Sequence, residues 1–185
     1  MSTTKYFTLS RIEVVNKISL FYGIIFVREV ISLRKLFILR GAMGSGKSTF
    51  IKDNNLEDYT LNSDKIRLMY NSPEMTINYN EMIPQFNNKK VWNLLFQILE
   101  DRMRKGELTF IDAMHIYSED LSIYKKLSEK YRYRLYIIDF TDIEYEELLN
   151  RNKQRETKKW VPEESIKRVY KALKKEKIPK AFTII

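Results

Sequence analysis

The chain has 185 residues, of which 44% are hydrophobic, enough to bury the core of one domain but not of two. It contains no cysteine, which excludes disulfides and thiolate sites, and its apolar run at 18–27 is shorter than the ~20 residues of a membrane span. The net charge of +9 favours partners that carry phosphates. This composition predicts a cytoplasmic protein that binds no membrane.

Residues 1–33 precede the first clear strand and contain no motif of known chemistry. A helical period and a β-forming composition overlap within 18–27, so this part could be a helix packed on the core or an added strand. We therefore expect an N-terminal extension of unassigned role over 1–33, followed by one domain over residues 34–185.

A nine-residue turn follows the extension, and the rest of the chain is organised around it. The segment 41–49 fits G-x-x-x-x-G-K-[ST] in full, and the apolar run 36–39 before it predicts a buried strand. Such a loop turns backbone N–H groups and a helix N-terminus toward nucleotide phosphates. Lys47 is expected to reach the β- and γ-phosphates, and Ser48 to bind Mg²⁺. The expected ATP ligands in this loop are Gly41, Gly44, Ser45, Gly46, Lys47, Ser48 and Thr49.

A second predicted strand, at 59–62, delivers a carboxylate to the same edge of the sheet. Asp64 follows this strand, and Arg67 lies one turn later on a short helix predicted over 65–70. In phosphoryl transfer to an alcohol, Asp64 is placed to be the base and Arg67 to hold a phosphate of the acceptor. The alternative is that Asp64 only caps the helix and Arg67 is a surface charge.

The middle of the chain continues the alternation of helices and strands. Residues 71–84 predict a long loop, and the apolar period over 87–105 predicts a helix that ends at the following glycine. A third strand at 108–111 places Asp112 at its C-terminal end. Asp112 could serve Mg²⁺ or orient Arg67 through an ion pair, and both roles stay open.

One histidine lies in the connection that follows Asp112. A helix over 118–131, which Ser118 can cap, and a strand over 134–139 come after it. His115 has no partner at the spacing of a metal site, so we expect a structural or exposed side chain rather than a catalytic one.

The last third of the chain carries a second group of cations. Asp142 can cap a helix over 143–155, which places Arg151 and Arg155 on one face. We expect a lid around 143–162 that closes these arginines over the triphosphate, followed by a final helix. The alternative is an ordinary solvated basic face.

Strands that alternate with helices predict an α/β fold, a three-layer sandwich of the P-loop NTPase type. We expect a parallel sheet of about four strands, in the order 2-3-1-4, with helices on both faces and a helical lid. Because ligands bind at the C-terminal ends of parallel strands, the phosphate loop, Asp64 and Asp112 should meet at one edge. This convergence is the main indication of catalysis.

Four motifs occur in order along the chain: Gly-Ala-Met-Gly-Ser-Gly-Lys-Ser-Thr (41–49), Leu-Asn-Ser-Asp-Lys-Ile-Arg (61–67), Phe-Ile-Asp (110–112), and Arg-Asn-Lys-Gln-Arg (151–155) followed by Trp-Val-Pro (160–162). In this order they resemble the phage-type 5′-hydroxyl polynucleotide kinases, over roughly residues 36–173. The resemblance implies transfer of the γ-phosphate of ATP, with Mg²⁺, to the 5′-hydroxyl end of DNA or RNA.

The resemblance also assigns roles to single residues. The lysine and serine with which that family binds ATP and Mg²⁺ match Lys47 and Ser48. Its catalytic aspartate, and the arginine that holds the acceptor's 3′-phosphate, match Asp64 and Arg67. Its lid arginine on the donor phosphates looks like Arg155.

Two further positions match the family, and several features depart from it. Arg151 looks like a companion of the lid arginine, and Asp112 matches the carboxylate that ends the third strand. Compared with the family, the spacer between the phosphate loop and Asp64 is short, and the break before Val161 is one residue longer. Residues 1–33 have no counterpart in the family. The D-x-D-G-T phosphatase motif of many members is absent from the sequence, so no 3′-phosphatase activity is expected. A phage-encoded enzyme would act in the host cytoplasm, and a homo-oligomer stays open.

Two other functions fit parts of the same pattern. P-loop kinases of small metabolites, antibiotics or aminoacylated tRNA share the loop and the lid, whereas a slowly hydrolysing nucleotide switch would share the loop alone. Arg67 favours the polynucleotide, because a 5′-hydroxyl end always offers an adjacent phosphate and a metabolite usually does not. A switch would need a water-orienting residue and a switch loop, and the sequence identifies neither.

The positive charge leads to a first prediction. If acceptor binding rests on Arg67 and a basic surface, affinity for a single-stranded oligonucleotide should fall roughly tenfold between ~50 and ~200 mM salt, as for two or three phosphate contacts. ATP affinity should change less. Fluorescence anisotropy with a labelled oligonucleotide measures the first, and a flat salt response would instead indicate a small neutral acceptor.

Overall fold

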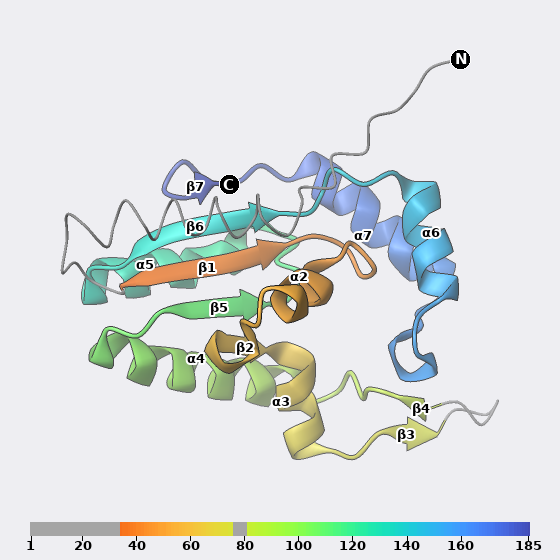
Figure 1. Ribbon diagram of the computed structural model, residues 1–185, viewed down its shortest axis with the longest axis horizontal. Coiled ribbons are helices and arrows are strands. Elements are labelled where there is room, and N and C mark those ends of the chain that lie inside the picture. Colours follow the sequence, from red (N-terminus) through yellow and green to blue (C-terminus); the bar gives the residue numbers. More distant parts are fainter. Residues whose placement is uncertain (1–33, 76–80) are drawn as a thin grey trace. The chain divides into compact units, whose positions relative to one another are not determined.

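Five parallel strands form the central sheet (Figure 1), and β1 lies in its middle, between β5 and β6. They are β1 (Lys35–Arg40), β2 (Thr60–Asn62), β5 (Thr109–Asp112), β6 (Arg134–Asp139) and β7 (Thr183–Ile184). Their spatial order is β2-β5-β1-β6-β7. The predicted order of the first four strands is therefore confirmed. The fifth strand, β7, was not predicted, because a strand of two residues is too short to show a hydrophobic period.

The computed structural model describes residues 34–75 and 81–185, and Arg34–Ile185 form one compact unit. The choice between helix and strand for 18–27 falls outside the described residues. Within those two ranges, no helix is both long and apolar enough to cross a membrane.

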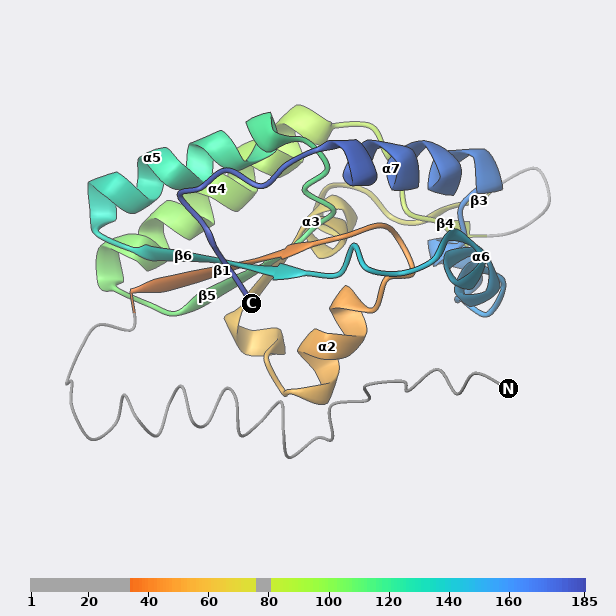
Figure 2. The same ribbon diagram turned by 90° about the horizontal axis from the view of Figure 1, so that it is seen from above.

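Helices cover both faces of the sheet, as predicted (Figure 2). Over one face lie α4 (Asn88–Lys105), α5 (Ser122–Tyr131) and α7 (Glu163–Lys175), and over the other lies α2 (Lys47–Asp53). Because both faces are covered, Leu36, Ile38 and Leu39 of β1 are all fully buried. The three-layer α/β sandwich is confirmed.

The longest helix, α4, supplies one wall of the main core. Val91, Leu95, Leu99 and Met103 recur every four residues, so they form one stripe that packs on the sheet side, and all four are fully buried. Gly106 adopts a left-handed φ of 82° and ends the helix, as predicted.

Two further helices stand at the C-terminal end of the sheet, α3 (Ser63–Tyr70) and α6 (Tyr145–Lys153). Short 3₁₀ turns occur at η1 (Glu57–Tyr59), η2 (Ser118–Leu121) and η3 (Thr157–Lys159). The helix expected to be capped by Ser118 therefore opens with a 3₁₀ turn, and the prediction of Ser118 as its cap is wrong, because Ser118 is the first residue of that turn and Tyr117 is its cap. The loop expected over 71–84 contains an antiparallel hairpin, β3 (Glu74–Met75) with β4 (Glu81–Met82), whose short strands lack a sequence period.

The bounds of α6 correct the predicted lid helix. Asp142 does not cap it, because Glu144 is still extended and the helix begins only at Tyr145. The helix stops before Arg155. The side-chain amide of Asn152 donates a hydrogen bond to the carbonyl oxygen of Val161 and accepts one from its N–H, and so turns the chain back. Arg155 therefore lies in the segment between α6 and η3.

His115 is buried against β1 and structural, as expected. Its Nδ1 lies 2.8 Å from the carbonyl oxygen of Leu39, and its Nε2 lies 2.9 Å from the Tyr124 hydroxyl. Because a carbonyl oxygen only accepts, Nδ1 carries the proton and the Tyr124 hydroxyl donates to Nε2. Neither ring nitrogen is left for a ligand.

The buried imidazole predicts a loss of stability in mild acid. Burial lowers the pKa of His115 from 6.5 to about 4. Between these values the unfolded chain binds a proton that the folded protein does not, so stability falls as pH drops. We expect this group to remove about 3 kcal/mol of unfolding free energy across that window.

Urea unfolding between about pH 7 and pH 4 measures this loss. The control is His115→Asn, because asparagine tolerates the left-handed φ of 49° and does not titrate. An imidazole NMR resonance that titrates near its ordinary pKa would contradict the prediction, and the chain has a single histidine to follow.

Candidate active site

The phosphate loop joins β1 to α2, and two of its glycines are required by geometry. A Cβ on Gly41 would lie 2.7 Å from the Ser45 hydroxyl oxygen and 2.9 Å from Cβ of Phe140, so no side chain fits there. Gly46 has a left-handed φ of 102° and directly precedes α2. The loop therefore presents bare backbone at the start of a helix.

Lys47 lies inside this loop. Its Nζ donates to the carbonyl oxygens of Gly41, at 2.9 Å, and Ala42, at 2.7 Å. Burial lowers the pKa of Lys47 to about 8; nearby Asp112 opposes this shift, and nearby Arg155 adds to it. The ammonium group is thus within electrostatic reach of both a carboxylate and a lid cation.

Asp112 ends β5 and is buried beside the phosphate loop. Its Oδ2 accepts hydrogen bonds from the Ser48 hydroxyl and from the Asn62 side-chain amide, each at 2.7 Å. The described ranges contain no group of three or more His, Cys, Asp or Glu that could hold a metal. The adjacent oxygens of Ser48 and Asp112 nevertheless fit Mg²⁺, which takes one or two protein ligands and shares the rest with phosphate and water.

Arg67 pairs with a different carboxylate. Its Nη1 lies 3.3 Å from Oδ1 of Asp64, and its Nη2 donates to the side-chain oxygen of Asn88 at 2.6 Å. Arg67 is only 8% exposed, so the alternative of a surface charge is wrong. The alternative that Asp64 caps α3 is also wrong, because the cap is Asn62. Asp64 leaves half of its side chain exposed.

Asn88 is a contact that the sequence did not reveal. It is the first residue of α4 and lies twenty-one positions after Arg67, with no local pattern to link the two. Only the packing of α3 against α4 brings them together.

Of the two lid arginines, Arg151 belongs to α6 and Arg155 lies in the segment after it. Arg151 Nη1 lies 3.8 Å from the position that a Cβ on Gly46 would occupy, and its Nε pairs with Glu147 at 2.7 Å. Burial lowers the pKa of the Arg155 guanidinium, and nearby Asp64 opposes that shift. Arg155 is therefore partly buried close to the carboxylate that Arg67 contacts.

Two guanidinium nitrogens in the site have no partner. Among buried side-chain nitrogen and oxygen atoms of the described residues, only Arg67 Nε and Arg155 Nη1 make no hydrogen bond. An unsatisfied buried donor costs about 1–3 kcal/mol, and more when it is charged, so it calls for an explanation. Both nitrogens belong to arginines predicted to bind phosphate, and an anionic oxygen would satisfy them.

Comparison with known proteins agrees with this fold and loop. A comparison with curated proteins finds no match. A chain of the Pnkp1/Rnl/Hen1 RNA repair complex is similar with a TM-score of 0.62 and 24% identity, over 80% of this chain and 47% of that one. A chain of a second Pnkp1/Rnl/Hen1 structure is similar with a TM-score of 0.53 and 25% identity, over 67% of this chain and 40% of that one. This chain thus spans less than half the length of either.

The match of this chain to a known protein family covers the site as well as the sheet. It extends over residues 36–176, from β1 to the end of α7, and so includes the phosphate loop, both carboxylates and the lid arginines. A phosphate loop of this kind implies nucleotide binding. The chain therefore belongs to the AAA domain family.

Proposed function

We propose that the protein is a kinase that transfers the γ-phosphate of ATP to the 5′-hydroxyl end of a polynucleotide. The observation that carries this proposal is the pair of unpartnered guanidinium nitrogens, on Arg67 and Arg155, close to Asp64. A reaction between two phosphate-bearing substrates needs a cation for each of them. One arginine comes from the helix that carries Asp64, and the other comes from the lid.

The donor side consists of the phosphate loop and the lid. Backbone N–H groups of the loop and Lys47 bind the β- and γ-phosphates, while Arg151 and Arg155 contact the donor phosphates from the lid. Ser48 and Asp112 would hold Mg²⁺, which supplies charge neutralisation on the β- and γ-oxygens. Lys47 exchanges its contacts with loop carbonyls for stronger ones with phosphate.

The acceptor side centres on Asp64. Its exposed carboxylate accepts the proton of the 5′-hydroxyl while the O5′–Pγ bond forms and the bond from Pγ to ADP breaks. Arg67 holds the adjacent phosphate of the acceptor through its free Nε. Asp64 and Asn88 bind the other two nitrogens and so orient the guanidinium group. The similarity to a chain of an RNA repair complex supports a nucleic-acid acceptor.

The deciding assay offers labelled ATP and Mg²⁺ with 5′-hydroxyl DNA, 5′-hydroxyl RNA and a panel of small alcohols. We expect label on the nucleic acid. Lys47→Ala should abolish transfer, and Asp64→Ala should reduce it about 10²–10⁴-fold while still binding ATP, because Asp64 serves the acceptor hydroxyl. Asp101→Ala, on the exposed side of α4, is the matched control.

The outcomes separate the candidates. Label on a small alcohol alone would replace the polynucleotide by a metabolite, and slow ATP hydrolysis without transfer would indicate a nucleotide switch. Near-normal transfer by Asp64→Ala would end its assignment as the base.

Substitution of Arg67 and of Arg155 should change different kinetic parameters. Arg67→Ala should raise the acceptor KM and reduce the preference for a 3′-mononucleotide over the matching nucleoside by about ten- to a hundredfold, the value of a charged hydrogen bond. Arg155→Ala should mainly lower kcat, by roughly 10³-fold, because a cation on the transferring group matters most in the transition state.

Full kinetics of each variant with both acceptors check this division. Lysine should rescue neither arginine fully, because it lacks the planar fork. Arg104→Ala, at an exposed arginine of α4, controls for loss of charge. An Arg67→Ala enzyme that keeps the wild-type preference for the 3′-phosphate would place the acceptor clamp elsewhere.

A further inference from the structure

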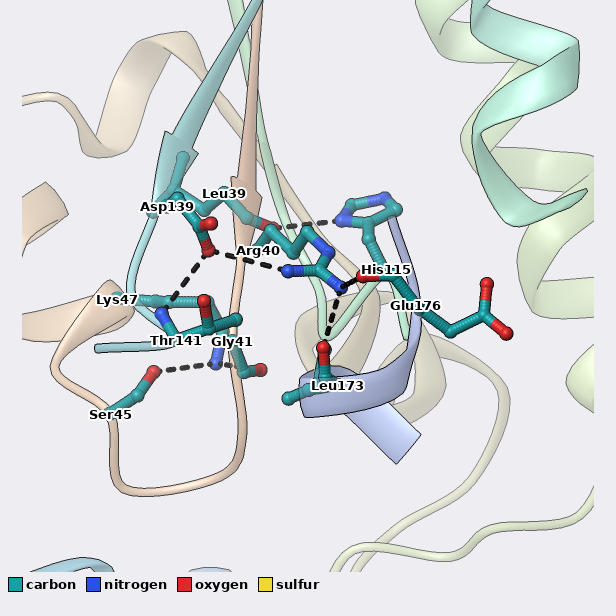
Figure 3. Close-up of polar contacts among 10 residues, drawn as sticks. All are labelled: Leu39, Arg40, Gly41, Ser45, Lys47, His115, Asp139, Thr141, Leu173 and Glu176. Carbon is teal, nitrogen blue, oxygen red and sulfur yellow. Dashed lines mark hydrogen bonds and ion pairs between the residues drawn. The ribbon is translucent and has the colours of Figure 1, made fainter. Parts of the chain in front are cut away.

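Arg40 is a buried cation that neither half of the proposed reaction uses. It is the last residue of β1, directly before the phosphate loop, and is only 3% exposed. Its Nη1 lies 3.5 Å from Oδ1 of Asp139. Its Nη2 donates to the carbonyl oxygens of Leu173, at 3.2 Å, and Glu176, at 3.3 Å (Figure 3).

One of these partners lies before the lid, at the end of β6, and the other two lie at the end of α7, the helix that follows the lid. The chain leaves β6 at Asp139, runs through α6 and η3, and returns along α7 to Leu173 and Glu176. The Asp139 carboxylate also accepts from the backbone N–H of Thr141, at 3.2 Å, and so turns the outgoing chain toward α6. One guanidinium group therefore links the strand that precedes the lid to the end of the helix that follows it.

The chemistry suits a tether. Leu173 and Glu176 belong to the last turn and the C-cap of α7, where backbone carbonyls lack helical partners and a cation is favourable. The neighbouring strands place Arg40 opposite Asp139 in register, so the ion pair follows directly from the pairing of β1 with β6. Lysine could keep this ion pair but could not reach all three oxygens with one planar fork.

A hydrophobic cluster separate from the main core packs the lid. Leu148 of α6 packs with Ala42 of the phosphate loop and with Ile166, Val169 and Leu173 of α7 in a small cluster of its own. The main core is a different cluster, formed by the sheet with α4 and α5. The lid is thus positioned by this small cluster, by the contact of η3 with β4, and by the residues on either side of it.

We propose that Arg40 is a positioning residue that fixes the lid over the phosphate loop and thereby places Arg155 on the donor phosphate. The tether itself does not depend on the identity of the acceptor, whereas its effect on kcat rests on the proposed function. Two measurements therefore test the two parts separately.

The first measurement is amide hydrogen exchange in the full chain. Arg40→Met should speed exchange across residues 145–159 by roughly tenfold or more relative to β1 and β5, because the lid opens locally. The matched control is Arg34→Met. Arg34, at the other end of β1, donates to the carbonyl oxygens of Tyr131, at 2.8 Å, and Met103, at 3.4 Å, at the ends of α5 and α4. It should loosen those helices and leave the lid unchanged.

The second measurement is a double-mutant cycle in kcat. Arg40→Met should lower kcat by roughly ten- to a hundredfold, as expected for a misplaced catalytic group, with ATP affinity changed less. In an Arg155→Ala background, Arg40→Met should lower kcat by less than about threefold, because the residue that Arg40 positions is gone. Arg40→Lys should fall between wild type and Arg40→Met.

If Arg40→Met does not fold, Arg40→Lys and Asp139→Asn carry the same two measurements. Unchanged exchange in the lid would overturn the tether. A full, multiplicative loss in the Arg155→Ala background would overturn the link to Arg155. If no acceptor is phosphorylated, the proposed function fails, and the exchange comparison still decides the tether.

Discussion

The parallel direction of the strands is the constraint on which the site depends. Because every strand of the central sheet runs the same way, residues that end or follow β1, β2 and β5 meet at one edge although they are far apart in the chain. The register pairs Leu39 with Asp112 and Asp112 with Asn62 across three neighbouring strands. The carboxylate of Asp112 thereby reaches Ser48 of the phosphate loop. Asp64, directly after Ser63, lies at the same edge, on the side proposed for the acceptor.

Electrostatics then give the edge its chemistry. Lys47, Arg67 and Arg155 are wholly or partly buried there, and Asp64 and Asp112 are too few to pair with all of their donors. Burying unpartnered guanidinium nitrogens lowers the stability of the folded chain, and such costs typically persist where function needs them. The arrangement is therefore prepared for anionic oxygens, on both the donor and the acceptor side.

The lid is built as a separate small body on this edge. Because α6 and α7 share a hydrophobic cluster with the phosphate loop and not with the main core, we expect the lid to open at a lower free energy than the sheet. In the proposed reaction, opening would admit and release substrates, and closing would hold Arg151 and Arg155 beside the loop. In the proposed tether, Arg40 links these events to β1, because its backbone leads into the phosphate loop while its side chain contacts Asp139 before the lid and the end of α7 after it.

The sequence by itself determined the features that local patterns encode. Hydrophobic period, turn residues and the phosphate-loop motif predict the first four strands, their order and the helices between them, and the spacing of Asp64 and Arg67 predicts that they share one face of a helix. The tertiary structure alone decided which segments become neighbours. It made Ser48 and Asn62 the hydrogen-bond partners of Asp112 and made Asn88 a partner of Arg67. It also added β7 to the sheet. The physical reason is that a buried polar group takes whichever partner the packing of distant elements brings within hydrogen-bond reach, and no local period records that choice.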